Sequence, residues 1–504
     1  MNTFDKVIGY KSIKQELQQI CDMIRNRTVY EEMGARLPHG LLLYGDPGLG
    51  KTLLAKCLIE ESGLNAITIR RDRGGDAFIS SIMEAFAKAK ADAPAIIFLD
   101  DMDKFSAEDA SYRDTPEYAA VQAGIDDIKE SNVFLIATAN EIRKLPISLR
   151  RSGRFDRKLH IQAPTASDAE AIIAHYIKGK RLADDVNIKD LAMMMRYQSC
   201  AELETILNEA AVRAAFCRQS CIQMKDMVSA VLKQQYDAYE DIPCVSDEVM
   251  KYVALHEAGH LVVAETLCPG SVGFVSLLPS EENRCGGFVH RCKTLPAYEE
   301  TIIVLSGKAA VEMRHAGQAA DGCSTDIEQA VSSIRDAIAK KGTMGFSFLD
   351  IENNTSCDIS KSLQLRSETA IQIELERCYN IAKRILAQNE TFLNKVTEVL
   401  LEKKSLLYSD IRGIRSSTVK SHVAVTHEAS SQCYQLQEEE ALPTDDPAAE
   451  YKQRIMRKIE EYREKTAPLN SQKVVLDSPY FETHRHIIQI EAVRPWFHAA
   501  TLLR

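Results

Sequence analysis

The chain has 504 residues, of which 45% are hydrophobic, so it is long enough to form two or three packed domains. Its formal net charge of −10 argues against a general nucleic-acid binder, which normally presents a basic face. The 13 cysteines are odd in number and never spaced Cys-x-x-Cys, which favours a reducing, cytoplasmic location. No stretch approaches the roughly 18 to 20 apolar residues of a membrane span, so none is expected.

A glycine-rich loop stands between a predicted strand, residues 40–44, and a predicted helix that starts at residue 51 and ends near Gly63. In this context glycines let backbone amides wrap phosphates, a lysine reaches the terminal phosphates, and a threonine hydroxyl can bind magnesium. The sequence therefore predicts a site for ATP and Mg²⁺ made by Gly45, Asp46, Pro47, Gly48, Leu49, Gly50, Lys51 and Thr52.

Two further apolar strands deliver polar residues at their carboxyl ends. Residues 95–99 lead to Asp100 and Asp101, where one carboxylate would hold magnesium and its neighbour would polarise the attacking water. Residues 133–138 lead to Asn140, which is placed to sense the attacked phosphate. These residues complete the partner set that the glycine loop requires.

Two arginines follow these strands, in the segment that runs from residue 152 to residue 157. Surface arginines are usually solvated, but the order of the preceding motifs favours a catalytic role. We expect Arg154 and Arg157 to stabilise charge on a γ-phosphate, most naturally that of a neighbouring subunit.

A second kind of chemistry is predicted on a helix that starts after Ser246 and runs to Leu267. His256 and His260 are one helical turn apart, so both imidazoles can bind one zinc ion, and Glu257 is placed to take a proton from the attacking water. The pattern His-Glu-x-x-His predicts a hydrolytic zinc site.

A catalytic zinc needs a third protein ligand from elsewhere in the chain. Asp326 is a candidate, and its position equally suits a cap for the helix that follows it. Glu312 is a weaker candidate for a carboxylate that supports a ligand. Cys285, Cys292 and His290 fit no metal-binding spacing, and we expect a strand edge there that accepts extended peptides.

Together these motifs resemble the AAA ATPase family, and specifically the FtsH-type ATP-dependent zinc metalloproteases, from about Phe4 to about Ile414. The resemblance implies that Asp100 holds magnesium, that Asn140 is a sensor, and that Asp326 is the third zinc ligand. It also implies a hexameric ring in which Arg154 and Arg157 act across the subunit interface.

The resemblance also implies the domain organisation and the fold class. An α/β AAA ATPase domain with a parallel sheet would span residues 1–163, and a small helical lid would span residues 164–241. A mostly α-helical zinc metallopeptidase domain would span residues 245–415, followed by a polar linker and tail of unknown role at 416–504. FtsH-type proteases have a membrane-spanning segment ahead of the ATPase domain; because that domain starts within the first ten residues here, we expect none.

The sequence departs from the family pattern in two places, one acidic residue and one loop. The second acidic residue after the strand at 95–99 is normally glutamate, so Asp101 is one methylene short for a general base and we expect slower hydrolysis. The aromatic pore loop that grips substrate has no clear match, and Phe78, which lies where it is expected, is predicted to be a core residue.

The predicted function is therefore an ATP-dependent zinc metalloendopeptidase that captures unfolded or tagged proteins and hydrolyses their peptide bonds, with Zn²⁺, ATP and Mg²⁺ as cofactors. The alternative is a nucleotide-gated remodelling or assembly protein with weak ATPase activity and a zinc peptidase site that works without ATP. Asp101 and the altered pore segment favour the alternative. A nucleic-acid motor is disfavoured by the acidic charge.

Overall fold

The computed structural model describes residues 3–71, 75–106, 115–151, 153–238, 246–278, 286–315, 323–340 and 361–418. Several predictions lie outside these residues: the middle of the altered pore segment, Ser152, the linker at 239–245, Cys285, and the tail beyond residue 418. The chain divides into two compact units, one made of residues 1–330 and 377–418 and one made of residues 331–376 and 419–504.

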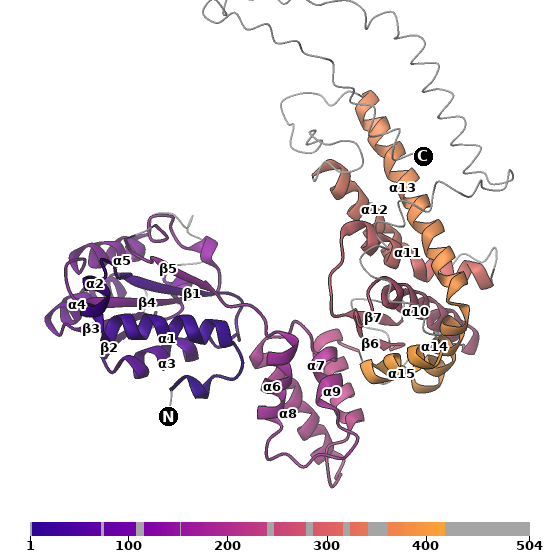
Figure 1. The fold of residues 1–504 in the computed structure, drawn as a ribbon, viewed down its shortest axis with the longest axis horizontal. Coiled ribbons are helices and arrows are strands. Elements are labelled where there is room, and N and C mark those ends of the chain that lie inside the picture. Colours follow the sequence, from indigo (N-terminus) through magenta and orange to yellow (C-terminus); the bar gives the residue numbers. More distant parts are fainter. Residues whose placement is uncertain are drawn as a thin grey trace, which may run out of the picture. The chain divides into compact units, whose positions relative to one another are not determined.

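The N-terminal part of the first unit is built on a five-stranded parallel sheet with the order β2-β3-β4-β1-β5 (Figure 1). Parallel pairing brings the carboxyl ends of the strands to one edge, where the predicted nucleotide residues follow β1, β3 and β4. The strands are β1 (Gly40–Tyr44), β2 (Asn65–Ile69), β3 (Ala95–Leu99), β4 (Val133–Ala139) and β5 (Arg157–His160).

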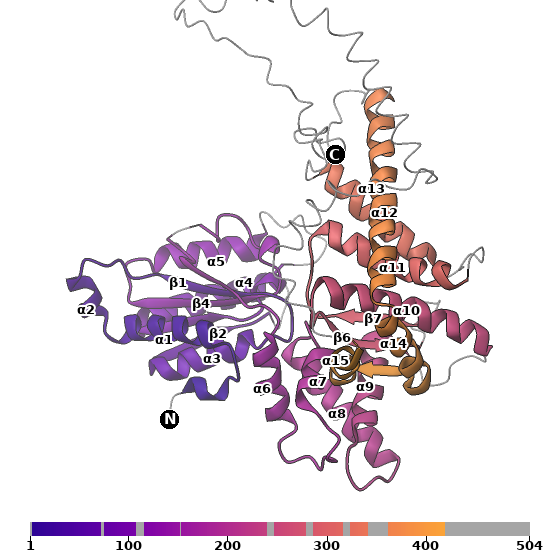
Figure 2. The same ribbon diagram turned by 45° about the vertical axis from the view of Figure 1, so that its right-hand side comes forward.

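Helices cover both faces of this sheet (Figure 2). Side chains alternate along β1: Leu41 and Leu43 join the core formed with α1 (Lys11–Arg25) and α3 (Lys51–Ser62), while Leu42 joins the core formed with α4 (Asp76–Ala91) and α5 (Pro116–Asp127). Shorter elements complete the domain: η1 (Thr3–Lys6), α2 (Arg27–Glu32), η2 (Met102–Lys104) and η3 (Ile142–Lys144). The predicted α/β class is confirmed.

Phe78 belongs to the core of this domain. Its side chain is buried and packs edge-on against Phe105, with 5.1 Å between the ring centroids. The prediction that it is a core residue is confirmed, so Phe78 is not an exposed aromatic for gripping substrate.

The next part is helical, as predicted, and three of its four helices begin at a side-chain cap. Thr165 and Asn187 accept backbone N–H groups at the first two helices, and Ser199 forms a capping box with Glu202 at the third. The helices are α6 (Ala166–Tyr176), α7 (Ile188–Met194), α8 (Cys200–Phe216) and α9 (Met224–Tyr236).

The remaining part of the first unit is mostly helical and contains an antiparallel sheet with the order β7-β6-β8. The predicted cap is confirmed, because Ser246 accepts the N–H of Val249 at the start of the first helix. Near the C-terminal end of this part, the short strand β8 stands between two helices and pairs with β6. The elements are α10 (Asp247–Leu267), β6 (Val272–Ser276), β7 (Phe288–Arg291), α11 (Ala297–Arg314), α12 (Ser324–Ala339), α13 (Lys361–Gln388), α14 (Glu390–Lys403), β8 (Ser405–Leu407) and α15 (Tyr408–Thr418).

The helices α6–α9 and the antiparallel sheet share one hydrophobic core. Phe274, Leu278 and Phe288 are buried in the same cluster as the apolar side chains of the four helices. The buried carboxylate of Asp190 on α7 also accepts hydrogen bonds from the backbone N–H of Ser409, at 2.9 Å, and from its hydroxyl, at 2.6 Å. The two parts are therefore packed together by apolar burial and by specific polar contacts.

The described core of the second unit is small and is formed by the C-terminal part of α12 and the N-terminal part of α13. Its buried residues are Ile334, Ile338 and Ile371. Among the described residues, no helix has both the length and the apolar character needed to cross a membrane.

Candidate functional site

The glycine loop after β1 adopts a conformation that only glycine accommodates easily. Gly45 has φ 144°, and a Cβ there would lie 2.0 Å from the carbonyl oxygen of Ile161. Gly48 has φ 77°, and a Cβ there would lie 2.8 Å from the hydroxyl of Ser199. The loop therefore lies close against β5 on one side and the start of α8 on the other.

The polar residues of this loop are already paired with one another and with the strand ends. The Lys51 ammonium donates to the carbonyl oxygens of Gly45 and Asp46, both at 2.7 Å, and burial lowers its pKa. The hydroxyls of Thr52 and Thr138 donate to the same oxygen of Asp100, at 2.9 and 2.8 Å. Thr52 and Asp100 are thus in the direct contact expected of residues that hold one magnesium ion.

Asp101 stands in a strained position beside them. Its φ is 54°, in the left-handed region, and its backbone N–H donates to the Thr138 hydroxyl at 2.8 Å. The carboxylate oxygen Oδ2 lies 2.9 Å from the Lys104 ammonium and 3.6 Å from the Arg70 guanidinium. The predicted general base is therefore bound by two cations as well as being short.

The other predicted ATPase residues occupy separate positions. Asn140 directly follows β4 at the carboxyl edge of the sheet and is half-buried. Arg154 donates to the carbonyl oxygen of Ser148, at 2.8 Å, and to Asp126, at 2.9 Å. Arg157 is exposed on β5, and its side chain has no hydrogen bond or ion pair within the described ranges. The arginine roles across a ring stay predictions.

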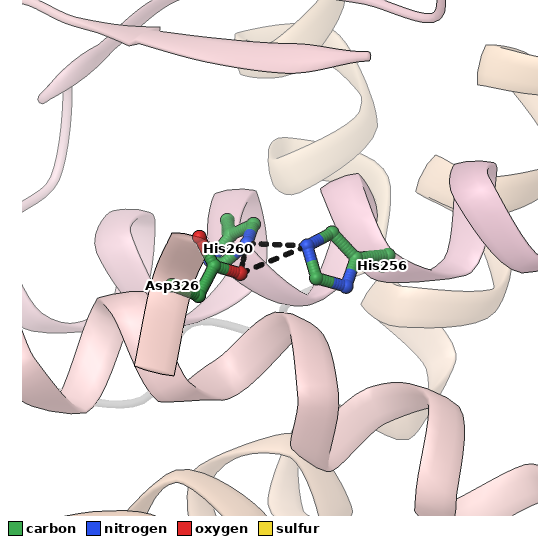
Figure 3. A group of neighbouring side chains, drawn as sticks. All are labelled: His256, His260 and Asp326. Carbon is green, nitrogen blue, oxygen red and sulfur yellow. Dashed lines mark hydrogen bonds and ion pairs between the residues drawn. The ribbon is translucent and has the colours of Figure 1, made fainter. Parts of the chain in front are cut away.

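The second site lies in the helical part, where α10 and α12 bring three side chains together (Figure 3). The Nε2 atoms of His256 and His260 are 3.0 Å apart, and Oδ2 of Asp326 lies 3.0 and 3.2 Å from them. Asp326 is in the first turn of α12, which starts at Ser324, so it does not cap that helix. Within the described part of the chain, these three residues form the one group whose geometry suits a metal ion.

The spacing of these atoms fits zinc. Ligands at about 2.0 to 2.1 Å in a tetrahedron are about 3.3 Å apart, close to the three distances found here. His260 donates through Nδ1 to the carbonyl oxygen of Ile303 at 2.7 Å, which leaves the Nε2 lone pair facing the other two atoms. Oδ2 of Asp326 is buried with no hydrogen bond to satisfy it in the described residues. A cation bound between the two Nε2 atoms and Oδ2 of Asp326 would accept an electron pair from each of these three atoms.

The pKa values of the site residues reflect their burial and their contacts with one another. Burial lowers the pKa of His260, but the neighbouring Asp326 carboxylate outweighs burial and raises that pKa to about 9. Burial lowers the pKa of His256, and the contact with Asp326 only partly opposes it. Burial raises the pKa of Glu257 to about 8, while the charge of His260 opposes the rise.

The backbone of α11 approaches the histidines closely. A Cβ on Gly307 would lie 2.5 Å from Cε1 of His256 and 2.5 Å from Nε2 of His260. On the other side, the Sγ atom of Cys323 lies 3.8 Å from Nδ1 of His256. Glu257 is buried beside Gly287, where a Cβ would lie 2.8 Å from its carboxylate oxygen. The start of β7 is therefore next to the predicted proton-transfer group.

Both halves of this chain match known families. Residues 41–163 match the ATPase family associated with various cellular activities (AAA), and residues 243–414 match peptidase family M41. An ATP-dependent zinc metalloprotease FtsH from Ruminiclostridium cellulolyticum is 30% identical over 468 residues, covering 86% of this chain and 74% of that protein. Another, from Caldicellulosiruptor bescii, is 30% identical over 453 residues, covering 81% of this chain and 71% of the relative.

The chain belongs to the FtsH family. It covers less of some other family members: FtsH 2 from Sphaerobacter thermophilus is 30% identical over 424 residues, which are 80% of this chain and 65% of that protein. The chain thus spans slightly less than two thirds of the length of that relative.

Within this FtsH family chain, the weaker sequence candidates have other partners. The Glu312 carboxylate contacts Lys308, Tyr379 and Lys383, and no hydrogen bond joins it to a histidine of the site among the described residues. The prediction that it supports a ligand is therefore wrong. The Cys292 thiol donates to the carbonyl oxygen of Met193, and Nδ1 of His290 contacts the Tyr236 hydroxyl at 2.7 Å.

Sequence reasoning missed three residues of this FtsH site that act through backbone or shape. These are Ile303, which supplies a carbonyl oxygen, Gly307, which gives the histidines room, and Cys323, which contacts His256. Gly307 stands alone in the middle of α11 and is the one signal in the sequence, because such a glycine usually has a packing reason.

Proposed function

We propose that this protein is an ATP-dependent zinc metalloendopeptidase, which couples an AAA ring to a hydrolytic site for peptide bonds. The observation that carries the proposal is the presence of two assembled sites on one chain. Thr52 contacts Asp100 beside the glycine loop, and His256, His260 and Asp326 converge at 3.0 to 3.2 Å beside Glu257. Membership of the FtsH family supports the same proposal.

In the peptidase site, each side chain has a role that follows from its position. Zinc, when held by His256, His260 and Asp326, would act as a Lewis acid that polarises the scissile carbonyl. Glu257 follows His256 on α10, and burial keeps its pKa high, so its carboxylate is suited to take a proton from water and return it to the leaving amine. The carbonyl of Ile303 fixes the orientation of the His260 ring.

In the ATPase site, the backbone of the glycine loop would bind the phosphates of ATP, and Lys51 would turn from the loop carbonyls toward them. Thr52 and Asp100 would hold Mg²⁺, and Asn140 would sense the attacked phosphate. Asp101 is the proposed general base. Two arginines, Arg154 and Arg157, are the proposed contacts to a neighbouring subunit in a homo-hexamer.

The proposed substrates are unfolded or tagged proteins. Gly287, directly before β7, lies beside Glu257, and an extended peptide could align with that strand near the scissile bond. The proposed compartment is the reducing cytoplasm, in keeping with the free state of the cysteines that the structure describes.

The test is cleavage of a fluorescent unfolded protein by the purified full chain. Three conditions are compared: ATP, a non-hydrolysable ATP analogue, and no nucleotide, with Glu257→Gln as the inactive control. We expect cleavage with ATP and little without hydrolysis. Equal cleavage in all three conditions, abolished by Glu257→Gln, would contradict coupling and leave an ATP-independent peptidase.

A specific observation favours the second candidate, a nucleotide-gated remodelling or assembly protein with feeble ATP turnover. Asp101 is ion-paired with Lys104 and Arg70, and Phe78 is buried in the core. Under the first proposal, Asp101 does not limit turnover, so Asp101→Glu should leave ATP hydrolysis and cleavage within about twofold of wild type. Under the second, the short base limits turnover, so Asp101→Glu should raise the kcat of ATP hydrolysis about tenfold.

A further inference from the structure

Asp103 is a buried carboxylate in the ATPase domain that the roles described above do not use. It lies in η2, three residues after Asp100, and its side chain is 7% exposed. An ionised carboxylate inside a protein is costly unless its oxygens accept hydrogen bonds. The backbone N–H of Glu141 donates to Oδ2 at 3.4 Å, while Oδ1 is buried and has no partner in the part of the chain that the structure describes.

The turn that carries Asp103 is fixed from both sides. The buried Tyr118 hydroxyl donates to the carbonyl oxygen of Met102 at 3.0 Å. Phe105, on the other side of the turn, is buried and packs edge-on against Phe78. Because the backbone on both sides of Asp103 is anchored in the core, the turn holds the residue inside the domain.

The carboxylate joins two loops at the edge of the sheet where the nucleotide is expected. β3 and β4 are adjacent parallel strands, and the loop after β3 carries Asp103 while the loop after β4 carries Asn140 and Glu141. Burial lowers the pKa of the Lys51 ammonium, and Asp103 is near enough for its charge to oppose that change. Asp103 is therefore part of the polar surroundings of the glycine loop.

The other two carboxylates of this segment are already occupied. Asp100 accepts two threonine hydroxyls, and Asp101 is paired with Lys104 and Arg70. Of the three carboxylates, Asp103 is the one that keeps a buried oxygen without a partner in the described residues. A buried carboxylate oxygen normally accepts a hydrogen bond, and the described residues supply no donor for Oδ1 of Asp103.

We propose that Asp103 is a positioning residue of the ATPase site. Its Oδ2 holds the backbone at Glu141, and thereby the preceding Asn140, against the loop after β3. Its Oδ1 accepts a hydrogen bond from a water molecule that is ordered when ATP is bound. This inference rests on the proposed ATPase activity and adds a third carboxylate to the site.

The test is Asp103→Asn in the full chain, which keeps an oxygen for the Glu141 N–H and removes the charge and one acceptor. We expect the Kd for a fluorescent ATP analogue and the KM for ATP to stay within about threefold of wild type. The kcat of ATP hydrolysis should fall about 10- to 100-fold, because a misplaced group costs that much. The melting temperature without nucleotide should stay equal or rise, since a buried charge is removed.

Asp92→Asn is the matched control, because Asp92 is an exposed carboxylate of the same domain, and it should change none of these values. A kcat for Asp103→Asn within about twofold of wild type would overturn the proposal. So would a lower melting temperature or loss of analogue binding, since either result would make the charge structural. A wild-type chain without ATP turnover would instead contradict the proposed function, and with it the role of Asp103.

Discussion

Gly307→Ala tests whether the metal site depends on the close approach of α11. The added methyl would lie 2.5 Å from both His256 and His260, whereas ordinary contacts need about 1 Å more. Metal–ligand distances tolerate shifts of about 0.2 Å, so at least one histidine would leave its position. Loss of oriented ligation should lower zinc affinity by about 100-fold or more, equivalent to about 2.7 kcal/mol.

Zinc affinity is measured by competition with a chromophoric chelator, and cleavage of an unfolded protein is followed in parallel. Gly413→Ala on α15 is the matched control, because a Cβ there meets nothing within 4 Å. That control should bind zinc like wild type and gain up to about 1 kcal/mol of stability from helix propensity. A Gly307→Ala protein that binds zinc within about threefold of wild type would refute the steric argument.

Three further changes have expected outcomes. Cys323→Ala removes the thiol beside Nδ1 of His256 and should weaken zinc binding about tenfold, measured by the same chelator competition; unchanged affinity would show that the thiol does not orient the ring. Burial lowers the folded-state pKa of His290 to about 4, so the unfolded chain binds its proton first as the pH falls below about 6.5, and stability is lost. Urea unfolding at pH 7.5 and 5.0 should therefore show about 2 kcal/mol more loss in wild type than in His290→Gln, and equal losses would contradict this account. Arg415→Met removes a cation 3.2 Å from the fully buried Glu265 carboxylate, which keeps two backbone N–H donors, and should cost about 1.5 to 3 kcal/mol in denaturant unfolding; no loss would mean that the backbone donors suffice.

Local patterns predicted those parts of the sites that lie in continuous sequence. A strand, a glycine loop and a helix are read from adjacent residues, and so are His256 and His260 on one helical turn. Asp326 is different, because its residue pattern equally suited a helix cap, and only the family resemblance favoured the metal. The structure separates the two readings because α12 starts at Ser324 and carries the carboxylate to the histidines.

The residues that sequence reasoning missed depend on tertiary approach. Ile303 contributes only a backbone carbonyl, which any residue could supply, and Gly307 contributes the absence of a side chain. β8 is three residues long, and helical spacing on both sides concealed it. The ion pair between Asp101 and Arg70 joins residues 31 positions apart by number, so neither the pattern nor the resemblance could show it.

The helices α6–α9 and the antiparallel sheet share one core. The start of the peptidase family match in the sequence is therefore not a boundary between two separately packed domains. If the chain were cut near residue 245, Phe274, Leu278 and Phe288 would lose the helices that bury them, and the Asp190 carboxylate would lose Ser409. Each fragment would then expose an apolar surface that favours aggregation. Heat or denaturant should therefore melt these two parts in a single cooperative transition, although the M41 family match begins only at residue 243, after the four helices.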